Sequence, residues 1–464
     1  MKSKNSSVNT GVRTERDSMG EMSVPEGALW GASTQRAALN FPIGQVRFEH
    51  RFIRTLALVK LACARANHEL GDLDKERYEA ITQACRQIAT GQFDQHFVVS
   101  IFQTGSGTST NMNANEVIAS LARASISVHP NDHVNMGQSS NDVIPTTIHV
   151  TLACAIQNEL LPALRKLSRS LGTRARRFHS VLKTGRTHLQ DATPVTFGQV
   201  FSGYKAQVDS QIKRLQKLVK SLSKVALGGT AVGTGINTRI AFAGTALDYL
   251  SNELGMTFAC ADNHFAAQGS IDALVEAAGC LQTLACALHK IANDIRWMAS
   301  GPRAGLSELT LPAIQPGSSI MPGKVNPVIL EAVMQVTYRV QGNSHTVVCA
   351  SQASNFELNV ALPVVAHSML ESVELLSDAC HVFVDKCLSG VAPTSVGPDL
   401  VERGLALCTA LAPVIGYEKA ALIAKEASRS GETILAVAQR LTDLSEAELK
   451  RILDPASMTT PNLN

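Results

Sequence analysis

The feature that most constrains the fold is a helical pattern about thirty residues long. Between Ser270 and Ser300, apolar residues recur at spacings of three and four, and Gly301 and Pro302 then end the pattern. At ~1.5 Å per residue this helix is about 45 Å long, which exceeds an ordinary globular helix. Because such a rod needs other helices to pack against, the sequence predicts a helical bundle.

Similar patterns predict further helices. They cover about 142–178, 196–225, 240–254, 327–352 and 363–387. Several are apolar on more than one face, which is typical of helices buried by other helices or by other subunits. Alternating strand patterns are scarce, so we expect a mainly α fold built as an oligomeric bundle.

The two ends of the chain differ from these rods. The first ten residues are polar and lack an apolar run, so we expect a flexible tail and no secretory signal. After a Pro/Gly break at 391–398, short helices are expected at 399–411, 417–430 and 432–441, and the capping-box spacing of Ser445 and Glu448 predicts a last helix. We therefore expect a small helical C-terminal domain that begins at about residue 396.

Composition limits the possible partners. The chain has 464 residues, 45% hydrophobic and 17% charged, with a net charge of +3, which favours neither disorder nor attraction to nucleic acid or a membrane surface. No stretch approaches the ~20 apolar residues of a membrane span. The ten cysteines include no CxxC pair and are interpreted as reduced core cysteines. We expect a cytoplasmic protein that acts on a small molecule without a metal or a cofactor.

Five loops between the predicted helices are rich in Ser, Thr, Asn and Gly. They cover 104–116, 129–142, 183–194, 227–238 and 317–327. Each loop alone is consistent with an ordinary turn, but five of them form a pattern. Nucleotide sites are rejected, because TGSGTSTN lacks the GKS or GKT ending of a phosphate loop and GGTAVGTGINT lacks the glycine spacing of a dinucleotide fingerprint.

The loop GSSIMPGKVNP, residues 317–327, predicts an anion site. Asn326 and the proline after it are expected to cap and begin a helix, whose positive end then faces the loop. Lys324, two residues earlier, can converge with free backbone N–H groups on one carboxylate or phosphate. Ser318 and Ser319 present hydroxyls over that anion. A serine acts as a base only if backbone donors stabilise its alkoxide.

A second polar loop contains Thr187 and His188. A single histidine is more often structural than catalytic, but here the neighbours supply hydrogen-bond donors without apolar bulk. Glu331 lies one turn into the helix that follows the 317–327 loop. If the fold brings this carboxylate to the imidazole, the two residues form a relay for general acid–base catalysis.

Several long motifs together resemble the fumarase/aspartase superfamily. GSSIMPGKVNP is similar to its signature. The other matching segments, in family order over essentially the whole chain, are TERDSMG, LWGASTQR, GSGTSTNMNANEV, HPNDHVNMGQSSNDVIPT, GRTHLQDATPVTFGQ, LGGTAVGTGINT, KIANDIRWMASGPRAGLSEL and NFELNV. Within the superfamily the chain resembles class II, iron-independent fumarate hydratases. Aspartate ammonia-lyases usually carry Gln at the place of His188 and Ala at those of Gly317 and Gly323.

This resemblance implies the reversible hydration of fumarate to L-malate, a step of the tricarboxylic acid cycle, by acid–base catalysis without metal. Ser318 is implied as the base that takes the C3 proton of malate, and His188 with Glu331 as its acid or water-handling partner. The implied dicarboxylate-binding residues are Ser106, Thr108, Ser139, Ser140, Asn141, Thr187, Ser319, Lys324 and Asn326. A second, non-catalytic dicarboxylate site is implied at His129, Asn131 and Asp132.

The resemblance also implies a three-domain fumarase/aspartase-type fold, with a mainly helical N-terminal domain, a central long-helix bundle and a small helical C-terminal domain. Their expected bounds are 1–138, 139–395 and 396–464. In that family four subunits pack their long central helices into one core, and each active site uses loops from three subunits. Two alternatives stay open. One is aspartate ammonia-lyase or a related fumarate-releasing lyase, and the other is a non-catalytic protein on the same scaffold, as in a lens crystallin.

Overall fold

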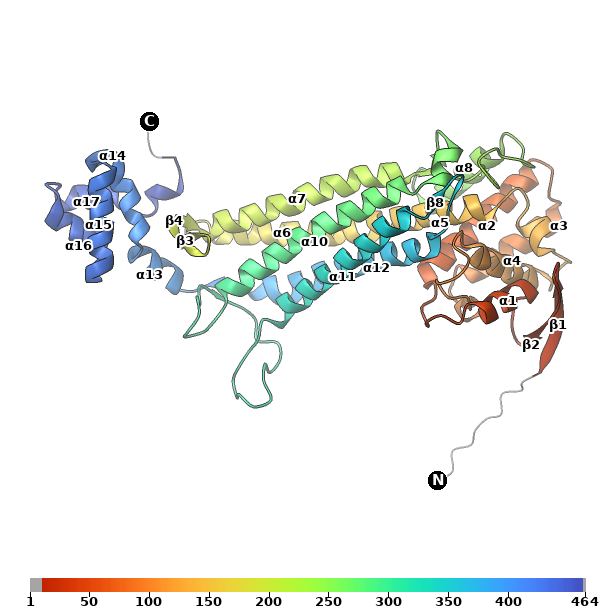
Figure 1. Cartoon of the computed structure of the whole chain (residues 1–464), viewed down its shortest axis with the longest axis horizontal. Helices are drawn as coiled ribbons and strands as arrows, with labels where there is room; N and C mark the ends of the chain where they lie inside the picture. Colours follow the sequence, from red (N-terminus) through yellow and green to blue (C-terminus); the bar gives the residue numbers. More distant parts are fainter. Residues whose placement is uncertain (1–10, 462–464) are drawn as a thin grey trace, which may run out of the picture. The chain divides into compact units, whose positions relative to one another are not determined.

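The structure, a computed structural model, describes residues 11–461, with the element labels of Figure 1. The expected tail over residues 1–10 lies outside the described residues. The chain forms two compact units. Unit 1 comprises Met1–Leu161, Arg214–Gln282 and Arg339–Leu375, and unit 2 comprises Pro162–Lys213, Thr283–Tyr338 and Leu376–Asn464. The division into three domains stays a prediction.

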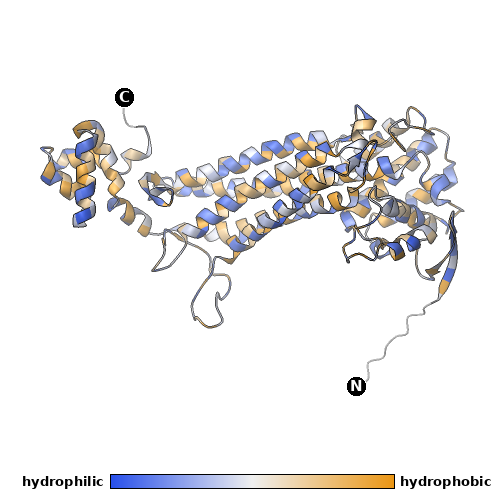
Figure 2. Ribbon diagram, viewed as in Figure 1, coloured by the Kyte–Doolittle hydropathy of each residue, from blue (hydrophilic) through white to orange (hydrophobic). Residues whose placement is uncertain are grey.

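The long helices follow the apolar periodicity of the sequence. They are α5 (Ser140–Ala155) with a π-helical turn (Ile156–Leu160) and α6 (Leu161–Arg177), α7 (Phe197–Leu222), α8 (Phe242–Leu254), α10 (Asp272–Met298), α11 (Val328–Ser351) and α12 (Leu362–Val382) with a π-helical turn (Phe383–Cys387). The prediction of these helices and of a mainly α fold is confirmed. Figure 2 shows hydrophobic and hydrophilic residues interspersed along them.

Unit 1 is built around α2, which is buried along most of its length and packs against α3, α5 and α8. Its further elements are β1 (Val12–Asp17), β2 (Gly20–Pro25), α1 (Ala32–Asn40), α2 (His50–Glu69), α3 (Lys75–Ile88), α4 (Thr108–Ala122), β5 (Lys224–Val225), β6 (Ala259–Cys260), α9 (His264–Gly269), β8 (Ser354–Asn355) and β9 (Leu358–Asn359), with short turns of 3-10 helix at Asp94–His96 and π-helix at Pro130–Val134. The antiparallel hairpin β1–β2 was not expected from the sequence.

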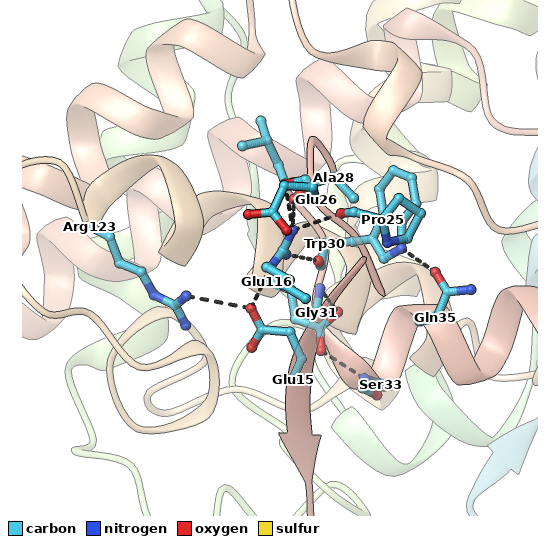
Figure 3. A network of polar contacts seen from close by, with 12 residues as sticks. Glu15, Pro25, Glu26, Ala28, Trp30, Gly31, Ser33, Gln35, Glu116 and Arg123 are labelled. Carbon is cyan, nitrogen blue, oxygen red and sulfur yellow. Dashed lines mark hydrogen bonds and ion pairs between the residues drawn. The ribbon is translucent and has the colours of Figure 1, made fainter. Parts of the chain in front are cut away.

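A carboxylate from α4 caps the start of α1 (Figure 3). Glu116 accepts hydrogen bonds from the backbone nitrogens of Gly31 (2.9 Å), Ser33 (3.0 Å) and Thr34 (3.1 Å). Beside it, Arg13 of β1 donates to backbone carbonyls at the end of β2 and in the segment leading to α1, those of Pro25, Glu26, Ala28 and Trp30. These contacts tie the N-terminal hairpin and α1 to α4, whose first residue is Thr108.

In unit 2, side-chain hydrogen bonds join neighbouring helices. Ser168 of α6 donates to Asp209 of α7 (2.5 Å), and Tyr204 of α7 donates to Asp294 of α10 (2.9 Å). The strands of this unit are β3 (Leu182–Thr187), β4 (Gln190–Thr196), β7 (Leu309–Thr310) and β10 (Ala392–Pro393). The prediction of a loop over 183–194 is wrong, because β3 and β4 form an antiparallel hairpin there (Figure 1).

The C-terminal part of unit 2 consists of short helices. They are α13 (Val396–Glu402), a 3-10 turn (Leu405–Leu411), α14 (Ala412–Ile415), α15 (Tyr417–Ser430), α16 (Ile434–Leu441), α17 (Glu446–Ile452), and 3-10 turns at Leu388–Gly390 and Ser457–Thr459. The single helix expected over 399–411 is wrong, because Gly404 adopts an extended backbone that separates α13 from the 3-10 turn. The capping box of Ser445 and Glu448 is confirmed.

The cysteines are all free, and their burial varies. Burial raises the pKa of Cys85 and of Cys380 to about 12, which keeps these thiols protonated and unreactive. The prediction that all ten are core residues is wrong for Cys286 and Cys349, which are exposed on faces of α10 and α11 that no described part of this chain covers. Among residues 11–461, none of the helices combines the length and the apolar composition that a membrane span requires.

Candidate active site

In unit 1, two helix N-termini meet through their hydroxyl groups. Thr108 begins α4 and Ser140 begins α5, and their side-chain oxygens lie 2.7 Å apart. The hydroxyl of Ser106 extends this chain, 2.9 Å from that of Thr108. Because each helix N-terminus offers free N–H groups and a partial positive charge, their convergence favours a bound anion.

The remaining implied ligands of unit 1 belong to the same site at the N-termini of α4 and α5, which we call the corner. Ser139 is the N-cap of α5, and its hydroxyl accepts the backbone N–H of Asn141 (3.2 Å). The Asn141 amide donates to the carbonyl of Ala231 (2.9 Å). The structure therefore brings together all the unit 1 residues implied to bind the substrate carboxylates, namely Ser106, Thr108, Ser139, Ser140 and Asn141.

Asp142, which sequence reasoning did not single out, holds this corner in place. It is fully buried; one carboxylate oxygen accepts the backbone N–H of Ser139 (2.9 Å), and the other accepts those of Gly228 (3.0 Å) and Thr230 (2.9 Å). Burial raises the pKa of the Asp142 carboxyl, and these backbone donors oppose the rise. The signal in the sequence was the capping-box spacing from Ser139 to Asp142.

A buried lysine supports the loop that precedes α5. Lys60 of α2 donates to the side-chain oxygen of Asn135 (2.8 Å), which also accepts from Asn111 (3.1 Å) and Asn115 (3.2 Å). The Lys60 side chain is fully buried, and burial lowers its pKa to about 8. In the sequence, Lys60 could have been recognised as a single charge inside the apolar run LALVKLACA.

Replacing Lys60 by methionine is expected to change how stability depends on pH. The unfolded chain binds this proton up to about pH 10.5, whereas the folded chain loses it near pH 8. The Lys60 contribution to the unfolding free energy therefore rises with pH between these values, by up to about 3 kcal/mol. Denaturant titrations at several pH values should show the wild-type protein gaining stability over Lys60→Met as pH rises from 8. A constant difference would contradict the assignment, and Lys75→Met, at an exposed lysine of α3, is the control.

Unit 2 contains the β3–β4 hairpin (Figure 1). His188 lies in its turn, as the pairing of the two strands shows. Thr187 pairs with Gln190, so His188 and Leu189 form a two-residue turn, with φ of 55° and 59°. Positive φ at both positions is typical of a type I′ turn, which normally favours Asn and Gly. The turn exposes His188, Thr187 and Leu189 together.

The 317–327 loop of unit 2 is closed by backbone and side-chain hydrogen bonds. The N–H of Gly317 donates to the carbonyl of Lys324 (2.8 Å), and the amide of Asn326 donates to the carbonyl of Gly317 (2.7 Å). A Cβ at Gly317 would lie 2.6 Å from the Lys324 carbonyl, so this closure requires glycine. Helix α11 begins at Val328, one residue later than predicted, and Asn326 bonds back into the loop.

The hydroxyl of Ser318 is hydrogen-bonded within the loop. Its oxygen accepts hydrogen bonds from the backbone nitrogens of Ile320 (3.3 Å) and Met321 (3.1 Å). Ser318 is half-buried, whereas Ser319 and Lys324 are exposed. Two N–H groups are therefore directed at one serine oxygen, on a loop that also carries the exposed Lys324.

The expected relay of His188 and Glu331 does not form within one chain. Glu331 lies in the first turn of α11 and is half-buried. Over residues 11–461, no hydrogen bond or ion pair joins its carboxylate to His188. The pairing stays a prediction.

The three residues of the expected second dicarboxylate site are neighbours at the π-helical turn after α4. All three are exposed, and the backbone N–H of Asp132 donates to Nδ1 of His129 (3.1 Å). His129 and Asn131 line a cavity of about 660 Å³ in unit 1, with Arg16 and Arg123 on its wall.

Comparison with known proteins places the chain in a family. Residues 20–342 match a lyase family, and residues 407–460 match a family described as the fumarase C C-terminus. A class II fumarate hydratase of Xylella fastidiosa is 50% identical over 450 residues, covering 96% of this chain and 95% of that protein. The chain belongs to the class II fumarate hydratase family. A second fumarate hydratase of this class, from Pseudomonas aeruginosa, is 50% identical over 460 residues, covering 98% of this chain and all 100% of its own.

The class II fumarate hydratase fold is also found by structural comparison. The crystal structure of a recombinant class II fumarase from Schistosoma mansoni matches with a TM-score of 0.96 at 36% identity, covering 98% of this chain and 100% of that one. The predicted fumarase/aspartase-type fold is therefore confirmed.

Proposed function

We propose that this class II fumarate hydratase family member catalyses the reversible hydration of fumarate to L-malate. The observation that carries the proposal is the environment of Ser318, whose oxygen accepts two backbone N–H groups. A serine hydroxyl is a weak base at neutral pH, and donors fixed at its oxygen stabilise the alkoxide form. Ser318 thus has the surroundings that a serine base requires.

In the proposed reaction, the Ser318 alkoxide takes the C3 proton of malate, and the electron pair moves into the adjacent carboxylate. That group becomes an aci-carboxylate with two negative charges, which Lys324 and the N-terminus of α11 stabilise. The C2–O bond then breaks, the C2–C3 double bond forms, and the leaving hydroxyl takes a proton from His188, paired with Glu331, to give water. Hydration of fumarate follows the same steps in reverse.

The dicarboxylate is proposed to bind at the hydroxyl-lined corner of unit 1, with further contacts from other subunits of the assembly. The converging helix N-termini of α4 and α5 support this assignment. The proposed ligands are those implied from the sequence, Ser106, Thr108, Ser139, Ser140 and Asn141 of unit 1 and Thr187, Ser319, Lys324 and Asn326 of unit 2. His129, Asn131 and Asp132 are proposed as the second, non-catalytic site.

We propose that the chain works as a cytoplasmic homotetramer whose active sites are shared between subunits. Apolar side chains of the Ser318 loop are exposed, among them Ile320 at 84% and Val325 at 48%. Exposed apolar loops of this kind are stabilised when another subunit covers them. Free cysteines are consistent with a reducing compartment.

An absorbance assay of the fumarate double bond tests the function. With L-malate as substrate, the purified protein should form fumarate, and with fumarate it should consume it. L-Aspartate supplied in parallel should give no product. Fumarate formed from aspartate, with none from malate, would instead favour an aspartate ammonia-lyase, and an assembled protein inactive on both would favour the non-catalytic alternative.

A further inference from the structure

A buried ion cluster lies beside the hairpin that carries His188, within unit 2. Glu308 is fully buried, and Nη1 of Arg186 lies 2.9 Å from both of its carboxylate oxygens. The ammonium of Lys183 lies 3.6 Å from the same carboxylate. Only 15% of the Arg186 side chain is exposed. Desolvation of these charges offsets much of their attraction, so the cluster is poorly explained by stability alone.

The hairpin is irregular at the point where it meets this carboxylate. Side chains three positions apart on a regular strand, such as Lys183 and Arg186, point to opposite faces. The β3–β4 register shifts between Thr184 and Arg186, so that two residues of β4 lie opposite Gly185. A bulge adds local twist, which accounts for both cations reaching one carboxylate. A Cβ at Gly185 would lie 2.5 Å from the Thr193 carbonyl, so the bulge also requires glycine.

Backbone hydrogen bonds hold Glu308 in place within unit 2. Its backbone N–H donates to the carbonyl of Met298 (2.8 Å), and its own carbonyl accepts the N–H of Thr394 (3.0 Å). The next two residues form β7, which pairs with β10. Both backbone groups and the carboxylate are therefore held at the point where the chain enters the segment leading to Ser318.

His188 has no such support of its own. In the described part of the chain, no hydrogen bond or ion pair involves its side chain, and it occupies a turn position with positive φ. The position of His188 therefore depends on β3, the strand that precedes it. Arg186 lies in this strand, two residues before His188.

We propose that Arg186 is a positioning residue, which through Glu308 fixes the hairpin tip with Thr187 and His188 relative to the base of the Ser318 loop. The inference rests on the proposed function, since its readout is the hydration reaction. Arg186 touches neither substrate nor reacting atoms in this assignment. Its effect on the reaction passes through the geometry of His188.

The test compares full-length Arg186→Ala, Arg186→Lys and Glu308→Gln with the wild-type protein. Arg186→Ala should lower kcat about 100-fold, the size of loss that a displacement of about 1 Å produces. KM should change far less than kcat. The apparent pKa values in the pH profile of kcat/KM should shift. Arg186→Lys keeps a charge opposite Glu308 and should recover part of kcat. Because Arg186 acts through Glu308, the double variant Arg186→Ala/Glu308→Gln should be no slower than the slower single variant.

Lys166→Ala is the matched control, because it removes an exposed ion pair with Asp385 in the same unit; kcat should stay at the wild-type value. Folding is checked by circular dichroism and by the assembly state. If Arg186→Ala is not folded, Arg186→Lys decides: reduced kcat with a shifted pH profile supports the proposal. Folded variants with wild-type kcat and pH profile, or additive losses in the double variant, overturn it. A wild-type protein inactive on malate and fumarate rejects the proposed function instead.

Discussion

Ser318→Ala is expected to remove most of kcat while changing KM little. The methyl group of alanine cannot take the C3 proton, whereas the groups proposed to bind the carboxylates remain in place. Loss of a positioned general base typically lowers the rate by ~10²–10⁴-fold. The two N–H groups of Ile320 and Met321 that now donate to the Ser318 oxygen would lose their acceptor. Steady-state kinetics on malate and on fumarate measure both parameters.

Ser319→Ala is the matched control for this change. Ser319 lies on the same loop and is exposed, and it is proposed only to contact the substrate. Its loss should therefore act mainly on KM. A Ser318→Ala protein that turns over malate at the wild-type rate would show that another group takes the proton, and the role of the Ile320 and Met321 donors would then need a different explanation.

The helical body could be predicted because its residues are buried with the period of a helix. In α10, Leu274, Leu281 and Leu288 are all buried, as their spacing predicts. The β3–β4 hairpin could not be predicted in this way. Its strands are polar, and its turn residues, His188 and Leu189, are not the Asn–Gly pair that usually marks a type I′ turn.

The candidate site was predicted from its motifs, but the residues that hold it were not. The hydroxyl contact between Thr108 and Ser140 joins loops that the sequence separates by 32 positions. Asp142 accepts from the backbone of Gly228, which lies 86 positions away along the chain. Glu308 binds Arg186, which lies 122 positions away. Local patterns carry no information about such partners, because the contacts arise only when the chain has folded.

Asp142→Ala is expected to weaken both stability and substrate binding. The change leaves three backbone N–H groups without an acceptor, that of buried Thr230 and those of half-buried Ser139 and Gly228. A buried N–H group left unpaired costs ~1–3 kcal/mol and a half-buried one costs less, so the unfolding free energy should fall by roughly 3 kcal/mol. The loop that presents Ser139, Ser140 and Asn141 would lose its anchor, which should raise KM for the dicarboxylate.

Asp74→Ala distinguishes this loss from that of an ordinary helix cap. Asp74 also caps a helix of unit 1, accepting from the backbone of Arg77 (2.9 Å), but it is exposed. Its removal should cost only about 1 kcal/mol and leave KM unchanged. Urea unfolding and kinetics of the two variants separate the cases. Equal stability losses, with an unchanged KM in Asp142→Ala, would mean that the carboxylate merely caps α5. A rise in KM confined to Asp142→Ala, with the larger stability loss, would show that substrate binding depends on one carboxylate joining the loops at Ser139 and Gly228.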